Sequence, residues 1–171
     1  MNKAVIDVLN KARADELGAI LQYMAQHYRL ADNDYGEVAA NIKLIAIDEM
    51  RHAEMFAERI YELGGMPTTT PDKPAKKGQD IRQALAHDSK EEQGALVSYN
   101  KYMNICLKNN DSISAKLFEQ IIKEEQEHLN YFDDVLNHIK ELGNSYLAKI
   151  AGGAAEAGAP PKGFMASKGG A

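Results

Sequence analysis

Two Glu-x-x-His stretches determine the fold: Glu49-Met50-Arg51-His52 and Glu125-Gln126-Glu127-His128. Each reads Glu-x-x-His inside a long run with apolar residues every three or four positions, which is the pattern of an amphipathic helix. Residues three apart share one face of a helix, so the glutamate and the histidine of each stretch point the same way. Because that face is the apolar one, both pairs are predicted to lie in the interior of a helical protein.

Two further glutamates extend this pattern into an internal repeat. Glu49 lies 33 positions after Glu16, and Glu125 lies 33 positions after Glu92. Glu16 and Glu92 are each followed by Gly, Ala and Tyr at the same offsets. On helical wheels both fall in the middle of an apolar stripe. The repeat therefore predicts four carboxylates and two imidazoles at similar heights in one core.

Four long helical patterns and one short one account for most of the chain. Polar turns at 32–36 and 109–112 separate the first helix from the second and the third from the fourth. The longest internal connection, residues 66–78, contains three prolines and cannot be helical throughout. Two short links and one long link predict an all-α four-helix bundle with one long crossover. A short fifth helix is expected over 145–151.

The chain is expected to form one domain, residues 1–152, followed by a flexible Gly- and Ala-rich tail, residues 153–171. The formal net charge of −5 disfavours nucleic acid as a partner, because phosphate contacts need clustered Lys and Arg. No apolar run approaches the length of a membrane span. With one cysteine and no signal-peptide pattern at the N-terminus, a reducing, cytoplasmic location is predicted.

Burying the repeated carboxylates requires compensation. Isolated buried carboxylates are strongly unfavourable, and four of them would repel one another. Two divalent cations match four carboxylates with neutral histidines, and carboxylate-rich sites that contain histidine suit iron or manganese. One Glu from each of two helices and one Glu-x-x-His from each of the others is the ligand pattern of di-iron bundles. The predicted metal ligands and catalytic residues are Glu16, Glu49, His52, Glu92, Glu125 and His128.

Other repeated residues have less specific interpretations. Tyr23 and Tyr99 lie two turns after Glu16 and Glu92, where each is either a core tyrosine with a satisfied hydroxyl or a hydrogen-bond donor to a ligand carboxylate. The matching glycines, Gly18 and Gly94, lower helix propensity and are interpreted as allowing close approach of helices.

With these motifs the chain resembles the bacterioferritins, haem-containing ferritins of the ferritin-like di-iron superfamily. The resemblance runs from about Val5 to Ile150 and is carried above all by Ile47-Asp48-Glu49-Met50-Arg51-His52-Ala53-Glu54. It implies iron storage and detoxification by a ferroxidase, which oxidises Fe(II) to Fe(III) with dioxygen or peroxide. It also implies a ferritin-like bundle, two-fold dimers and a hollow shell of twenty-four subunits that stores ferric mineral.

Met50 is a candidate haem ligand under this resemblance. A helical wheel places Met50 about 100° from Glu49, so the side chain points out of its own bundle. On its own that position suits an ordinary interface methionine. The resemblance implies that Met50 and its symmetry mate ligate one haem, haem b or a related iron porphyrin, between two subunits. It also implies a ferredoxin-type electron donor for iron release.

In the ferroxidase hypothesis, Glu49 and Glu125 bridge the two irons, His52 and His128 are terminal ligands, and Asp48 is a candidate guide for incoming iron. Two alternatives remain open from the residues. One is a rubrerythrin-like di-iron peroxidase or another di-metal oxidoreductase of small oligomeric state. The other is a non-catalytic haem-bridged or helical assembly protein. Particle mass and metal content would separate the three.

Overall fold

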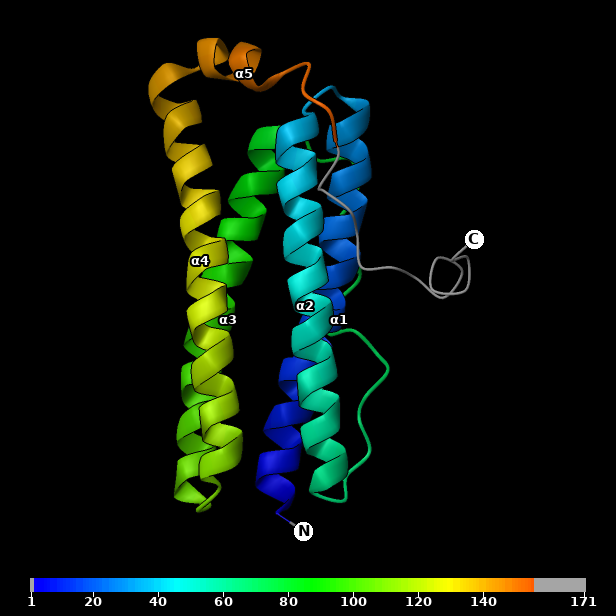
Figure 1. The fold of residues 1–171 in the computed structure, drawn as a ribbon, viewed down its shortest axis with the longest axis vertical. Helices are drawn as coiled ribbons and strands as arrows, with labels where there is room; N and C mark the ends of the chain where they lie inside the picture. The colour runs from blue at the N-terminus through cyan, green and yellow to red at the C-terminus, as the bar shows by residue number, and fades with distance from the viewer. Residues whose placement is uncertain (1, 156–171) are drawn as a thin grey trace, which may run out of the picture.

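The computed structural model describes residues 2–155, which fold into five helices and no strands. The two hairpins stand side by side as a four-helix bundle, and the fifth helix lies across one end of it (Figure 1). The predicted all-α bundle with a short fifth helix is confirmed. The helices are α1 (Lys3–Asp32), α2 (Gly36–Glu62), α3 (Ile81–Lys108), α4 (Ser112–Leu142) and α5 (Asn144–Ile150).

Local sequence sets several of the helix ends. Asp80 begins α3 with a capping box, in which its side chain accepts from the Gln83 backbone N–H and the Gln83 side chain accepts from the Asp80 backbone N–H. Asp111 caps α4 by accepting from the backbone N–H of Ser114. Gly143 joins α4 to α5 with a φ of 57°, a left-handed conformation that favours glycine.

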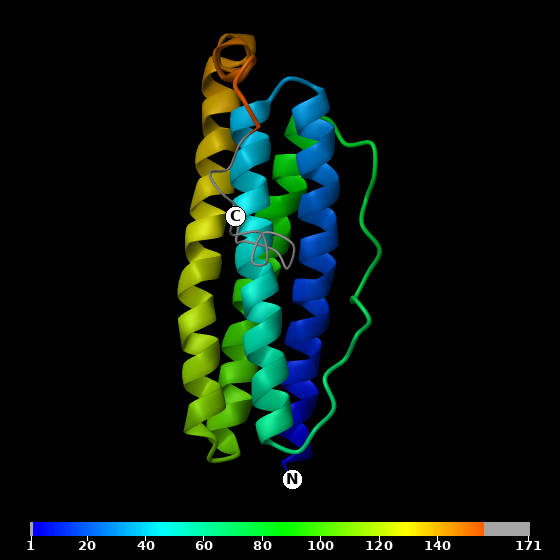
Figure 2. The ribbon, with the colours of Figure 1, turned by 45° about the vertical axis from the view of Figure 1, so that its right-hand side comes forward.

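The long crossover between α2 and α3 runs beside α1 along the bundle (Figure 2). Its backbone is tied to α1 by several hydrogen bonds. The Asp72 N–H donates to the carbonyl of Ala14 at 3.0 Å, and the Lys76 N–H donates to the side chain of Gln22 at 2.7 Å. The predicted connection is therefore an extended segment that packs along α1. None of the five helices combines the length and the apolar composition that crossing a membrane requires.

The chain beyond α5 returns to the turn between α1 and α2. The Gly152 N–H donates to the carbonyl of Asp34 at 2.9 Å, and Gly153 lies against Gly36. A Cβ on Gly36 would be only 1.8 Å from the Gly153 carbonyl oxygen, so this contact requires glycine. The predicted flexible tail falls, from residue 156 onward, outside the described residues.

Two apolar clusters fill the bundle, one toward each end. One cluster includes Leu9, Phe118 and Ile121, and the other includes Leu30, Ile42 and Leu85, all fully buried. Between them lies a layer of buried polar side chains, here called the polar belt. The polar belt consists of Glu16, Glu49, His52, Glu92, Glu125 and His128.

Candidate metal centre

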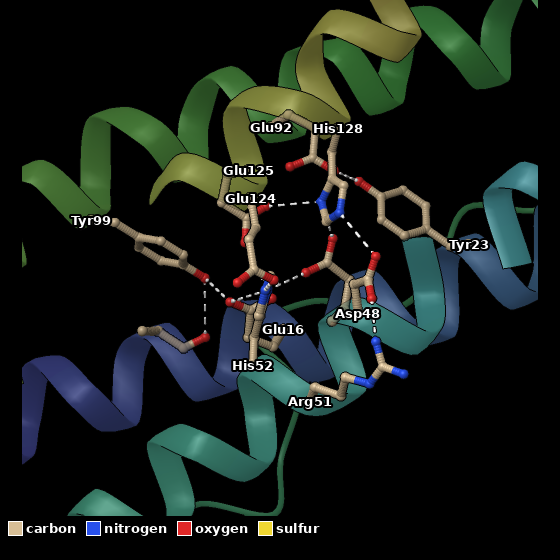
Figure 3. A network of polar contacts seen from close by, with 12 residues as sticks. Glu16, Tyr23, Asp48, Arg51, His52, Glu92, Tyr99, Glu124, Glu125 and His128 are labelled. Carbon is tan, nitrogen blue, oxygen red and sulfur yellow. Dashed lines mark hydrogen bonds and ion pairs between the residues drawn. The ribbon is translucent and has the colours of Figure 1, made fainter. Parts of the chain in front are cut away.

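Each of the four long helices contributes to the polar belt, as the repeat predicted. Glu16 comes from α1 and Glu92 from α3, whereas α2 and α4 each contribute one Glu-x-x-His pair. All six side chains are buried, with at most 6% of any residue exposed. Figure 3 labels the five residues other than Glu49 and shows them converging between the two helical hairpins. The sequence prediction that these six residues meet is therefore matched by the geometry.

The polar belt divides into two overlapping sets of four possible ligands. One set is Glu16, Glu49, His52 and Glu125; the other is Glu49, Glu92, Glu125 and His128. Within each set, one ligand atom per residue lies within 4.8 Å of all the others. Glu49 and Glu125 belong to both sets, so they are the residues placed to bridge two metal ions.

Each shared carboxylate, Glu49 and Glu125, has one oxygen near His52 and the other near His128. One oxygen of Glu49 lies 2.9 Å from His52 Nδ1, and its other oxygen lies 3.1 Å from His128 Nδ1. Glu125 repeats this arrangement, with oxygens 2.9 Å from His52 Nδ1 and 3.4 Å from His128 Nδ1. Each bridging carboxylate thus turns one oxygen toward each half of the centre.

Burial and neighbouring charges shift the pKa values of the polar belt. Burial, followed by the charges of Glu125 and Glu49, raises the pKa of Glu16 well above its ordinary value, and Glu92 shifts in the same way for the same causes. Burial opposes the charged imidazole, but the nearby carboxylates of Glu125 and Glu49 raise the pKa of His52 to about 12 and that of His128 to about 10. Metal ligands must be deprotonated, so a binding metal ion displaces these protons.

Three buried atoms of the polar belt lack a hydrogen bond of acceptable geometry among the described residues. They are Glu49 Oε1, Glu125 Oε1 and His128 Nδ1. Each atom instead lies at ion-pair distance from a charged group of the polar belt. Unpaired buried polar atoms are strongly unfavourable. All three atoms belong to residues of the two ligand sets, so the residues fit a pair of metal ions.

Two tyrosines orient carboxylates from opposite helices. The Tyr99 hydroxyl on α3 donates to Glu16 on α1 at 2.7 Å, and the Tyr23 hydroxyl on α1 donates to Glu92 on α3 (Figure 3). Of the two interpretations that the sequence left open, the structure supports hydrogen bonding to a candidate ligand.

Two carboxylates outside the polar belt also contact its histidines. Glu124 Oε2 lies 3.0 Å from His52 Nε2, and Asp48 Oδ2 lies 3.6 Å from His128 Nε2. Sequence reasoning missed Glu124 and considered Asp48 only as a guide for iron. The signal was present, because an acidic residue directly precedes the glutamate of both Glu-x-x-His stretches.

A cavity of about 220 Å³ reaches the polar belt from the side of α1, α3 and the crossover. Its lining includes Gly18 and Gly94, the two repeated glycines. The interpretation that they allow close approach of helices is wrong. A Cβ on Gly94 would meet nothing within 4 Å, and one on Gly18 would meet the Asp72 side chain of the crossover. These glycines leave space at the cavity.

Met50 lies outside the polar belt. Met50 is a large hydrophobic residue that is exposed, with 51% of its surface accessible to solvent in the single chain. The wheel-based expectation that it points out of its own bundle agrees with this exposure.

Fold and centre together define a class of protein, the ferritin-like four-helix bundles with a carboxylate–histidine centre for two metal ions. Residues 6–142 match the family model of the ferritin-like domain. The chain is 54% identical to the bacterioferritin of Desulfovibrio desulfuricans over 94% of its own length and 90% of that protein. It is 33% identical to the bacterioferritin of Brucella melitensis, covering 85% and 91% of the two chains. The chain belongs to the bacterioferritin family.

Solved structures agree with this assignment. An X-ray structure of the Desulfovibrio desulfuricans bacterioferritin, which reports its diiron site in different catalytic states, superposes with a TM-score of 0.91. It covers 94% of each chain at 54% identity. The BfrA bacterioferritin of Mycobacterium tuberculosis superposes with a TM-score of 0.84 at 30% identity, covering 88% of this chain and 96% of that one. The resemblance predicted from the motifs is confirmed.

Proposed function

We propose that the protein is a ferroxidase that oxidises Fe(II) at the polar belt and stores the product as ferric mineral. The observation that carries the proposal is the pair of buried four-residue ligand sets that share two carboxylates. Family membership supports iron as the metal, because the Desulfovibrio desulfuricans relative is described with a diiron site.

In this proposal one Fe(II) ion binds at Glu16 and His52, and the other binds at Glu92 and His128. Glu49 and Glu125 bridge them, one oxygen to each ion. Each Fe(II) gives one electron and leaves as Fe(III). The two electrons, with two protons, reduce one dioxygen to hydrogen peroxide or one hydrogen peroxide to two waters. Tyr99 and Tyr23 hold the outer carboxylates in place, and the negative polar belt stabilises the higher charge of the oxidised ions.

Stopped-flow oxidation of added Fe(II) tests the assignment. We expect the Glu92→Ala and His128→Ala variants to lose the rapid phase of oxidation, because each removes a ligand of one ion of the pair. Glu127→Ala, an exposed residue on the same helix as His128, is the matched control and should oxidise iron at the parent rate. Parent-like rates in Glu92→Ala and His128→Ala would contradict the assignment.

Storage requires an enclosing assembly, for which we propose two-fold dimers that form a shell of twenty-four subunits. Family membership supports this assembly. Native mass spectrometry of the purified protein tests it, with a particle of twenty-four chains expected and a dimer as the contrary result. We also retain two predictions from the sequence: a cytoplasmic location, and a single domain over residues 1–152 followed by a separate tail.

A haem between two subunits, which Met50 and its symmetry mate would hold, completes the proposal and would supply one-electron redox chemistry. A ferredoxin-type electron donor is proposed as the partner for iron release. The residue suits this role, because Met50 lies on α2 outside the polar belt and half of it is exposed in the single chain. Purified parent protein should show a low-spin haem spectrum that Met50→Leu lacks. Met66→Leu, which alters an exposed methionine of the crossover, should keep it.

A further inference from the structure

The outer nitrogens of the two candidate metal-binding histidines face carboxylates from the opposite hairpin. His52 on α2 contacts Glu124 on α4, and His128 on α4 contacts Asp48 on α2 (Figure 3). Each carboxylate directly precedes the bridging glutamate of its own helix. The internal repeat therefore extends beyond the polar belt to a reciprocal pair of contacts that cross between the hairpins.

We propose that Glu124 and Asp48 are positioning residues, which hold the rings of His52 and His128 so that Nδ1 of each faces the metal pair. This inference rests on the proposed function. A histidine whose Nε2–H donates to a carboxylate is fixed in orientation and in tautomer, which leaves Nδ1 as the metal-binding atom. The fixed ring is also a better ligand, because the carboxylate raises its basicity.

The two contacts are unequal. Glu124 Oε2 lies at hydrogen-bond distance from His52 Nε2, 3.0 Å, whereas Asp48 Oδ2 is 3.6 Å from His128 Nε2. Asp48 is also held by Arg51, whose guanidinium donates to Asp48 Oδ1 at 2.9 Å. The His52 side chain is fully buried, whereas the Glu124 side chain that contacts it is partly exposed. The structure therefore positions the ring of His52 more firmly than the ring of His128.

Titration with Co(II) in the absence of oxygen and iron tests this without turnover, because visible absorption reports ligand binding directly. In the Glu124→Ala protein we expect the affinity for one of the two Co(II) ions to fall by about 10- to 100-fold. Glu124→Gln retains an oxygen that accepts from Nε2–H and should restore most of the affinity. Asp48→Ala should weaken the other ion by a smaller factor, because its contact is longer.

Glu127→Ala is the matched control, since it removes one negative charge from the exposed face of α4 and leaves both histidine contacts intact. The far-UV circular dichroism and melting temperature of each variant establish that it is folded. The proposal is overturned if Glu124→Ala binds both Co(II) ions as the parent does, if Glu127→Ala loses as much affinity, or if Glu124→Gln fails to rescue. A parent that binds no pair of Co(II) ions would instead contradict the proposed function.

Discussion

The apolar ends of the bundle and the polar belt between them are built from the same four helices but affect stability in opposite ways. At the ends, side chains such as Phe118 and Leu30 are removed from water and pack closely, which stabilises the fold. In the belt, six ionisable groups lose hydration, and protons or metal ions must balance their charges. The ends therefore hold the helices in register, and this allows the belt to retain residues that favour metal binding over stability.

The largest effect is expected from opening a cavity in an apolar end. Phe118 is fully buried, with its ring 5.2 Å from that of Phe56. Phe118→Ala should lower the free energy of unfolding by about 3–5 kcal/mol, measured by chemical denaturation. The two Co(II) ions should still bind under native conditions, since Phe118 lies outside both ligand sets. A loss below about 1 kcal/mol would contradict the claim that packing at the apolar ends stabilises the fold.

A redox-inert metal ion should reverse the unfavourable contribution of the polar belt. At a free Zn(II) concentration of about 10 times the dissociation constant, each site should add about 1.4 kcal/mol to the free energy of unfolding, or about 2.8 kcal/mol for the pair. The measurement is denaturation with and without zinc. In a protein that carries both Glu49→Ala and Glu125→Ala, which removes both shared ligands, zinc should produce no comparable gain. Equal stabilisation of the two proteins would place the zinc elsewhere.

A smaller effect is expected where a tyrosine supports the belt. Tyr99→Phe removes the hydroxyl that donates to Glu16, which leaves a buried carboxyl oxygen without that donor. We expect roughly 1–2 kcal/mol lower stability in the metal-free protein, measured by denaturation in the presence of a chelator. Tyr102→Phe, at a partly exposed ring that packs on Tyr99, is the control. If both variants were equally stable, the hydroxyl would have no role in the belt.

The smallest effect is expected at the end of the bundle, where Asp111 caps α4 and pairs with Arg59 at 2.9 Å. Asp111→Ala should lower stability by about 1 kcal/mol at neutral pH. Burial opposes the charged form, but hydrogen bonds from Ser114 and Arg59 lower the pKa of Asp111 in the folded protein. The stabilisation is therefore full above the unfolded-state pKa, about 3.9, and is lost as the pH falls through the folded-state value. Denaturation of parent and variant should show a smaller difference at about pH 3 than at about pH 7; a constant difference would contradict this account.

Helical periodicity was sufficient to predict the bundle and the six residues of the polar belt. Residues on one helix share a face by spacing alone, so the sequence was enough to place Glu49 and His52 together. The 33-residue repeat then placed the other hairpin by analogy. Contacts between helices were harder to predict, because spacing within a helix does not specify which partner a side chain meets. Glu124 was missed for this reason, since its partner His52 lies on another helix.

The crossover shows the same limit. Its prolines excluded a helix, but its path along α1 depends on contacts with residues distant in sequence, such as that of Asp72 with Ala14. The interpretation of the repeated glycines was wrong because their role depends on that path. Gly18 faces the Asp72 side chain, whereas a Cβ on Gly94 would face open space.

The most direct test of the two-metal centre is anomalous X-ray diffraction from crystals soaked in ferrous iron without oxygen. We expect two iron peaks per chain, about 3.5–4 Å apart. Both should lie between Glu49 and Glu125, with His52 beside one and His128 beside the other. Crystals that show no iron between these carboxylates after soaking, or iron only on the protein surface, would contradict it.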